Sequence, residues 1–155
     1  MIREAGKADF DKVFMLEAQV YDLHLAAYPD MISPKLDQGI FREYYEDCLD
    51  GINGKTFVYE LDGEVLGYCV TRKREIKNHR LFFDMIVLEL DDICVDQKAR
   101  GKQVGKRLFE AAKSYADEIG ASRMELTVWE FNKHARHFFE LQGMTPRLTR
   151  MELAI

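Results

Sequence analysis

The stretch 90–108 reads Leu-Asp-Asp-Ile-Cys-Val-Asp-Gln-Lys-Ala-Arg-Gly-Lys-Gln-Val-Gly-Lys-Arg-Leu. An apolar β-type run ends at Val95, a short polar turn carries Arg100 and Gly101, and an amphipathic helical pattern begins near Gln103. The amides in the first turn of a helix lack partners inside the helix, and the helix dipole places partial positive charge there. Strand, turn and helix start together therefore predict a site for a phosphate-bearing ligand.

The side chains of this turn support the same prediction. Three cations, Arg100, Lys102 and Lys106, lie close together in a chain whose net charge is −5. Gly101 and Gly105 let main chain or ligand approach without a Cβ in the way. The stretch contains neither G-x-x-x-x-G-K-[ST] nor G-x-G-x-x-G. Spacing alone therefore leaves an ordinary strand-to-helix connection with solvated lysines equally open.

Length and composition predict a single domain over residues 1–155, with 47% hydrophobic and 32% charged residues. The cysteines Cys48, Cys69 and Cys94 are too few and too scattered for a disulfide framework, so we expect a reducing, cytoplasmic compartment. No apolar run is long enough to span a bilayer. The acidic balance argues against nucleic-acid binding, and the scattered histidines argue against a metal site.

Hydrophobic periodicity predicts the element order β, α, α, β, β, β, α, β, α, β. The expected strands are 2–5, 56–61, 64–73, 81–95, 122–128 and 149–153, and the expected helices are 9–27, 36–49, 103–119 and 132–142. Asp62-Gly63 predicts a two-residue hairpin turn. The fold class is therefore mixed α/β: one mostly antiparallel central sheet of six to seven strands flanked by about four helices.

Two segments of the second half resemble the GNAT superfamily of acyl-CoA-dependent N-acetyltransferases. The family's [QR]-x-x-G-x-[GA] window is here residues 100–105, in which Arg100 and Gly105 match and Gln103 stands where glycine is usual. The family's N-x-x-A-x-x-F-Y-E-x-x-G-[FM] segment is here residues 132–144, with Phe139 in place of the usual tyrosine. The resemblance implies a GNAT-like fold in which two strands splay apart at the CoA site.

The resemblance also implies acetyl-CoA as co-substrate. Its pyrophosphate would lie on the amides of residues 100–106, and its pantetheine arm would pair with the main chain of Ile93 and Val95 like an added strand. A positive φ at Gln103 would cost about 1 kcal/mol or more, so we expect the helix to begin normally there. The implied cofactor-binding residues are Ile93, Cys94, Val95, Arg100, Gly101, Lys102, Gln103, Val104, Gly105, Lys106, Asn132, Phe138 and Phe139.

The chemistry requires a base, because only the free amine attacks a thioester. Glu89 lies eleven residues before Arg100, at the spacing of a catalytic glutamate in several family members, and ranks first. Asp92 ranks second and Asp91 third; the alternative is that these acids are solvated or paired with nearby basic residues. Phe139 cannot protonate the leaving thiolate as a tyrosine would.

The acceptor pocket is expected to come from the first two helices and their loop, although core packing would also explain their aromatic residues. The candidates are Tyr21, His24, Tyr28, Phe41, Tyr44 and Tyr45. The predicted function is transfer of an acetyl group from acetyl-CoA to a primary amine of a small molecule or peptide, by direct attack in a ternary complex. The runner-up is a non-catalytic acyl-CoA-binding module. A homodimer formed through the last strands stays open.

Overall fold

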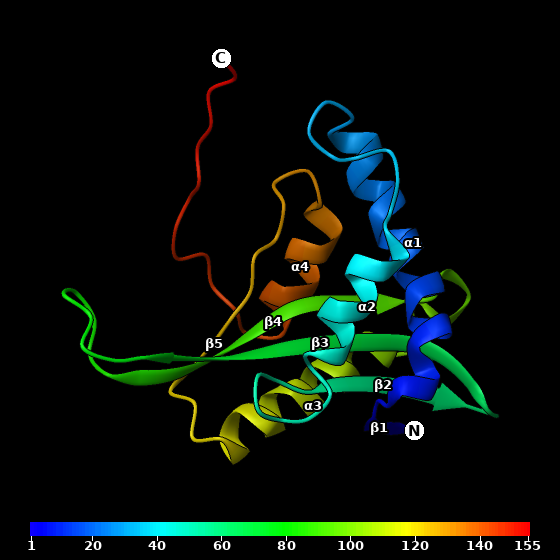
Figure 1. Cartoon of the computed structure of the whole chain (residues 1–155), viewed down its shortest axis with the longest axis horizontal. Helices are drawn as coiled ribbons and strands as arrows, with labels where there is room; N and C mark the ends of the chain where they lie inside the picture. Colours follow the sequence, from blue (N-terminus) through cyan, green and yellow to red (C-terminus); the bar gives the residue numbers. More distant parts are fainter.

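The sheet in the computed structural model, which describes residues 1–155, has five strands with helices on both faces (Figure 1). The strands are β1 (Ile2–Glu4), β2 (Thr56–Leu61), β3 (Glu64–Ile76), β4 (Met85–Val95) and β5 (Arg123–Glu125). They lie side by side in chain order, β1 to β4 antiparallel and β5 parallel to β4. Asp62 and Gly63, both with positive φ, form the predicted turn between β2 and β3. The expected mixed, mostly antiparallel sheet is confirmed.

The helices begin and end close to their predicted positions. They are α1 (Phe10–Ala27), α2 (Gln38–Glu46), α3 (Val104–Glu118) and α4 (Lys133–Leu141). The Asp37 carboxylate accepts hydrogen bonds from the amides of Gly39 and Ile40 at the start of α2, and the Asn132 side chain accepts one from Ala135 at the start of α4. No helix combines the length and the apolar character needed to cross a lipid bilayer.

Two apolar clusters cover the two faces of the sheet. On one face, Phe10 and Val13 of α1 and Tyr45 of α2 pack against β2, β3 and β4. On the other face, Leu108 of α3 and Phe139 of α4 pack against the same strands. In Figure 1, α3 lies on one side of the strands and α1 and α2 on the other. Each helix buries one apolar stripe, which is the pattern that periodicity predicts.

A β-bulge in β4 sets which residues reach each face. Val70 of β3 lies opposite Asp92 and Thr71 opposite Leu90, so Asp91 is an extra residue without a partner on β3. Alternation along the strand is therefore shifted by one residue at this point. Leu90 faces the α3 cluster, whereas Asp92 and Cys94 face the α1–α2 side. The bulge thus turns the Asp92 carboxyl toward α1.

The strands β4 and β5 separate at the predicted place. They pair only where Val87, Leu88 and Glu89 lie opposite 123–125, and beyond this the outer side of β4 has no strand partner. The Asp96 amide donates to Leu66 of the neighbouring β3. Because successive residues of a strand direct their main-chain groups to opposite sides, those of 93 and 95 face the gap. The expected splayed strands are present.

The prediction of six to seven strands was wrong, because no strand forms at 149–153. Residues 145–155 make no backbone hydrogen bond, and they run away from the sheet in Figure 1. Leu148, Met151 and Leu153 are exposed, and only Arg147 is tied back, through an ion pair with Glu125 at 2.8 Å. The physical reason is β5, which stops at Glu125 and offers too short an edge to hold another strand.

Candidate functional site

The turn between β4 and α3 presents main-chain donors that nothing in the protein uses. The amides of residues 101–106 make no hydrogen bond to an acceptor in the chain, and the first amide of the α3 region that does so is that of Arg107, to Gln103. Arg100, Lys102 and Lys106 carry positive charge at this turn, and the Arg100 Nε donates to the Val95 carbonyl at 3.3 Å. Free amides, a helix start and three cations form a site for an anion such as a diphosphate.

The backbone of this turn is left-handed at two positions, Gly101 (φ 76°) and Gln103 (φ 62°). Gln103 is the residue before the first helical residue, Val104, and its side chain makes no capping hydrogen bond. The expectation that the helix begins normally at Gln103 was therefore wrong. This φ explains why the family usually has glycine at the position of Gln103, because a side chain with a Cβ costs about 1–2 kcal/mol in the left-handed region.

The second motif packs directly against the first. A Cβ added at Gly105 would lie 3.4 Å from the Phe138 ring and 3.6 Å from Val95, so this ring covers the start of α3. Phe139 is buried, 7% exposed, with its ring 5.1 Å from that of Phe138 and 6.3 Å from that of Phe109. Asn132 caps α4. The position of the family tyrosine is thus occupied by a core ring.

A cavity of about 390 Å³ lies between α1, α2 and the β4 bulge, at the other end of the open segment of β4. Its carboxyl groups belong to Glu17, Asp91 and Asp92. Its aromatic walls are formed by Tyr21, His24, Phe41, Tyr44 and Trp129. A concave, largely aromatic cavity with a few convergent carboxyl groups has the general character of a small-molecule binding site.

Two of the carboxyl groups face each other across the Tyr68 hydroxyl. The hydroxyl oxygen lies 2.6 Å from a Glu17 oxygen and also within hydrogen-bond distance of Asp92. One phenol proton satisfies only one of these contacts, so the other requires a proton on a carboxyl group. Burial, followed by the Asp92 charge, raises the pKa of Glu17 to about 9, and burial also raises the pKa of Asp92. The pair therefore holds one proton at neutral pH and carries about one negative charge.

The third carboxyl group already has a partner. The Arg72 Nε donates to an Asp91 oxygen at 3.1 Å, and the guanidinium lies 4.9 Å from the centre of the Tyr44 ring. Arg72 also lies 3.4 Å from Asp47, outside the cavity. Asp91 therefore has a cationic partner, which it shares with Asp47, whereas Glu17 and Asp92 have none.

The structure brings together most of the predicted site residues but not all of them. Glu89 lies opposite Arg72 on β3 and Glu125 on β5, and it does not line the cavity. Tyr45 is fully buried, and its hydroxyl donates to the Gly6 carbonyl at 2.7 Å. It belongs to the core, as the alternative interpretation of the aromatic residues proposed. Tyr28 lies outside the lining, with its ring 5.0 Å from that of the lining residue Trp129.

Sequence reasoning missed four lining residues, the apolar Val20 and Ile32 and, more important for chemistry, Glu17 and Trp129. A signal for Glu17 existed, because it lies at helical spacing between Val13 and Val20 on the inward stripe of α1. A carboxyl group on such a stripe is seldom buried without a partner or a function. Trp129 follows β5 in an irregular segment, where periodicity carries no information about side-chain direction.

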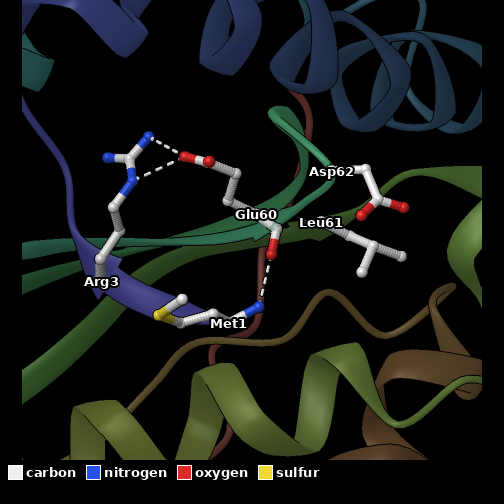
Figure 2. Close-up of a pocket in the computed structure, with 5 residues that line it drawn as sticks. All are labelled: Met1, Arg3, Glu60, Leu61 and Asp62. Atoms are coloured by element: carbon white, nitrogen blue, oxygen red, sulfur yellow. Dashed lines mark hydrogen bonds and ion pairs between the residues drawn. The ribbon is translucent and has the colours of Figure 1, made fainter.

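A second hollow, of about 260 Å³, lies at the far edge of the sheet beside β1 and β2. Figure 2 shows that Arg3 and Met1 both contact Glu60, whereas the Asp62 carboxylate stands apart from them. The Arg3 guanidinium pairs with the Glu60 carboxylate at 2.6 Å, and the amino group of Met1 donates to the Glu60 carbonyl. Because its two cationic groups are already paired with Glu60, this hollow is not a candidate site.

The chain matches the acetyltransferase (GNAT) family over residues 17–144. An uncharacterized N-acetyltransferase in the pepI 3′ region of Lactobacillus delbrueckii subsp. lactis is 33% identical over 104 residues, which is 64% of this chain and 59% of the relative. The match thus spans less than two thirds of that protein. The uncharacterized N-acetyltransferase YhfO of Bacillus subtilis (strain 168) is 28% identical over 127 residues, 72% of this chain and 80% of the relative.

Solved structures show the same architecture. A tetramutant of the BH1408 protein from Bacillus halodurans superimposes with a TM-score of 0.89 at 27% identity, covering 100% of this chain and 99% of that one. The aminoglycoside N-acetyltransferase AAC(6')-Iy, solved in complex with CoA, has a TM-score of 0.78 at 17% identity, covers 100% and 93% of the two chains, and shows likeness of fold alone. The family match over most of the chain, together with the splayed strands and the glycine-bearing corner, shows that this protein belongs to the GNAT family of acetyltransferases.

Proposed function

We propose that the protein is an N-acetyltransferase that moves an acetyl group from acetyl-CoA to a primary amine. The observation that carries this proposal is the placement of two unlike sites on either side of one open segment of β4. An acidic cavity lies at Asp92, a corner of free amides follows at 101–106, and the main-chain edge between them, at Ile93 and Val95, is open. An amine and a phosphate-bearing thioester are the two substrates that such a pair of sites would accept.

The residues present fit acetyl-CoA. The amides of 101–106 and the nearby cations would hold the pyrophosphate, and the strand edge at Ile93 and Val95 would hydrogen-bond the pantetheine amides as an added strand does, with Arg100 releasing the Val95 carbonyl. The CoA complex of AAC(6')-Iy supports the same co-substrate for this fold. Acetyl-CoA supplies the thioester carbonyl that the amine attacks.

The Glu17–Asp92 pair is the base that we propose for the acceptor. It carries about one negative charge in a partly buried cavity, so it attracts an ammonium group and can accept its proton. The amine freed in this way attacks the carbonyl carbon and the C–N bond forms. The nitrogen then gives its second proton to solvent, and the C–S bond breaks with the electron pair leaving on sulfur, so that the products are the amide and the CoA thiolate. Glu89, ranked first from its spacing, stays an alternative base that would act through water.

Direct transfer fits the cysteines better than an acetylated enzyme does. Cys94 lies two residues after Asp92 on β4, and its thiol donates to the Leu16 carbonyl at 3.3 Å. Burial, followed by the Asp92 charge, raises the pKa of Cys94 to about 12, so the nucleophilic thiolate is scarce at neutral pH. Phe139 offers no proton to the departing thiolate, which is a fair leaving group without one.

Calorimetry with acetyl-CoA, followed by CoA release with a panel of amines, tests the proposal. Wild type should bind acetyl-CoA and not ATP of equal concentration. Lys102→Glu should weaken binding by about tenfold, whereas Lys77→Glu, the same charge change at the exposed β3–β4 hairpin tip, should not. Binding without turnover of any amine would favour the runner-up, a non-catalytic acyl-CoA-binding module. Phe139 supports that alternative, because a buried phenylalanine occupies the position of the family's tyrosine. Absence of binding would reject both.

A further inference from the structure

We propose that the acceptor is a primary amine with a single positive charge and a flat apolar body, such as an arylalkylamine. This inference rests on the acetyltransferase function proposed above and concerns the same cavity. It names a substrate class that differs from polyamines and from the polycationic aminoglycosides on which some proteins of similar fold act. Charge and wall composition support it separately.

The first line of support is the number of charges in the cavity. Asp91 is matched by Arg72 at 3.1 Å. Glu17 and Asp92 are held together through Tyr68, and together they carry about one charge. One ammonium group therefore finds a partner there, and a second would have none. An unpaired charge in a partly buried cavity costs far more than it gains, so a diamine or an aminoglycoside fits poorly.

The second line of support is the aromatic part of the lining. His24 and Trp129 line the cavity with their ring centres 5.6 Å apart, and Tyr28 and Phe131, outside the lining, pack on them with ring centres 5.0 to 5.7 Å apart. This ring cluster joins α1 to the segment beside the β4–β5 gap. Phe41 and Tyr44 of α2 line the cavity from another side. Such walls bind the face or edge of another ring better than a hydroxylated sugar.

The size of the cavity agrees with these two points. Its volume of about 390 Å³ lies toward the small end of the roughly 300–1,000 Å³ typical of small-molecule sites. A one-ring amine fills such a space while its ammonium reaches the Glu17–Asp92 pair.

Trp129 provides a direct binding assay, because it is the only tryptophan of the chain and lines the cavity. We would titrate the full chain, with CoA present, with 2-phenylethylamine, n-butylamine, 1,4-diaminobutane and kanamycin, and follow its emission. We expect 2-phenylethylamine to bind about tenfold more tightly than the other three. Equal or tighter binding of n-butylamine, the diamine or kanamycin would overturn the inference. The titration measures amine binding and needs no turnover, whereas CoA release measures acetyl transfer. A failure of the proposed acetyl transfer would therefore appear in CoA release and leave the order of amine affinities unchanged.

A charge variant tests the same inference from the opposite direction. Arg72→Gln unmasks Asp91 and adds a second negative charge to the cavity, so the ratio of diamine to monoamine affinity should rise about tenfold. Arg72→Lys keeps the positive charge and should keep the monoamine preference. Far-UV circular dichroism checks that both variants fold. An unchanged ratio in folded Arg72→Gln protein would show that the charge count does not select the acceptor.

Discussion

The hollow beside β1 and β2 and the cavity between α1, α2 and β4 both contain carboxyl groups, but the protein treats them differently. Arg3 of the hollow binds Glu60, which also lines it, at 2.6 Å and Asp9, which lies outside the lining, at 2.7 Å. Its guanidinium holds the pKa of Asp9 below the usual range. In the cavity, Glu17 and Asp92 face each other without a cation, and the pKa of Glu17 is raised to about 9. Carboxylates with an internal cation stabilise the fold, whereas carboxyl groups without one leave room for a ligand's cation.

The largest expected effect tests whether the cavity acids do chemistry. Asp92→Asn keeps the shape of the side chain and removes the base, so kcat for acetyl transfer should fall by ~10²–10⁴-fold while the protein stays folded. Steady-state CoA release measures this. Glu89→Gln is the matched control and should lose less than about tenfold. If Glu89→Gln has the larger effect, Glu89 is the base. The contrast between the paired carboxylates of the hollow and the unpaired ones of the cavity would then not identify the catalytic group.

The pH dependence of stability sharpens the comparison next. The raised pKa of Glu17 means that the folded state holds a proton that the unfolded state has released above its ordinary pKa. The free energy of unfolding should therefore be highest near pH 5 and should fall as the pH rises to about 9, by up to ~1.4 kcal/mol per pH unit. Thermal melts across this range measure the slope. Glu17→Gln should flatten it, and the same slope in that variant would contradict the assignment of the proton.

The Arg3 side of the comparison predicts the reverse pattern. Arg3→Ala leaves Asp9 and Glu60 without their partner, and should lower the free energy of unfolding by about 1 kcal/mol because the pair is partly exposed. Acetyl transfer should be unchanged. Urea unfolding and CoA release measure the two quantities. A loss of activity that exceeds the loss of folded protein would mean that this edge of the sheet contributes to function after all.

The sequence was sufficient for most of the fold. Helical stripes, the Asp62-Gly63 turn and the start of the last helix at Asn132 are local signals, so they place the elements without tertiary information. The missing strand at 149–153 shows the limit of such signals. Its apolar residues alternate as a strand's would, but a strand also needs an edge, and β5 ends at Glu125.

The candidate site was predictable in its main-chain part and less so in its side chains. The glycine-bearing corner follows from spacing along the chain. The base does not, because the bulge at Asp91 shifts the alternation of β4 and turns Asp92 toward α1. The spacing of eleven residues between Glu89 and Arg100, from which Glu89 was ranked first, takes no account of such a shift. Glu17 belongs to α1, far from Asp92 in sequence. The one local signal for it is that a carboxyl group interrupts the apolar stripe of this helix.

The smallest expected effect concerns Gln103, in the turn between β4 and α3. The groups without partners in this turn are main-chain amides, whereas those in the cavity are carboxyl groups. Gln103→Gly removes the left-handed strain of about 1–2 kcal/mol but gives the unfolded chain about 0.5–1 kcal/mol more entropy, so stability should rise by at most about 1 kcal/mol. Affinity for acetyl-CoA should stay within about twofold, because the amide and not the side chain is the donor. Gln103→Ala, which keeps the strain, should show no gain in urea unfolding. If instead Gln103→Gly and Gln103→Ala both weaken calorimetric binding by about tenfold, the Gln103 side chain contacts the ligand. The unpaired main-chain amides would then not be the only groups of this corner that bind acetyl-CoA.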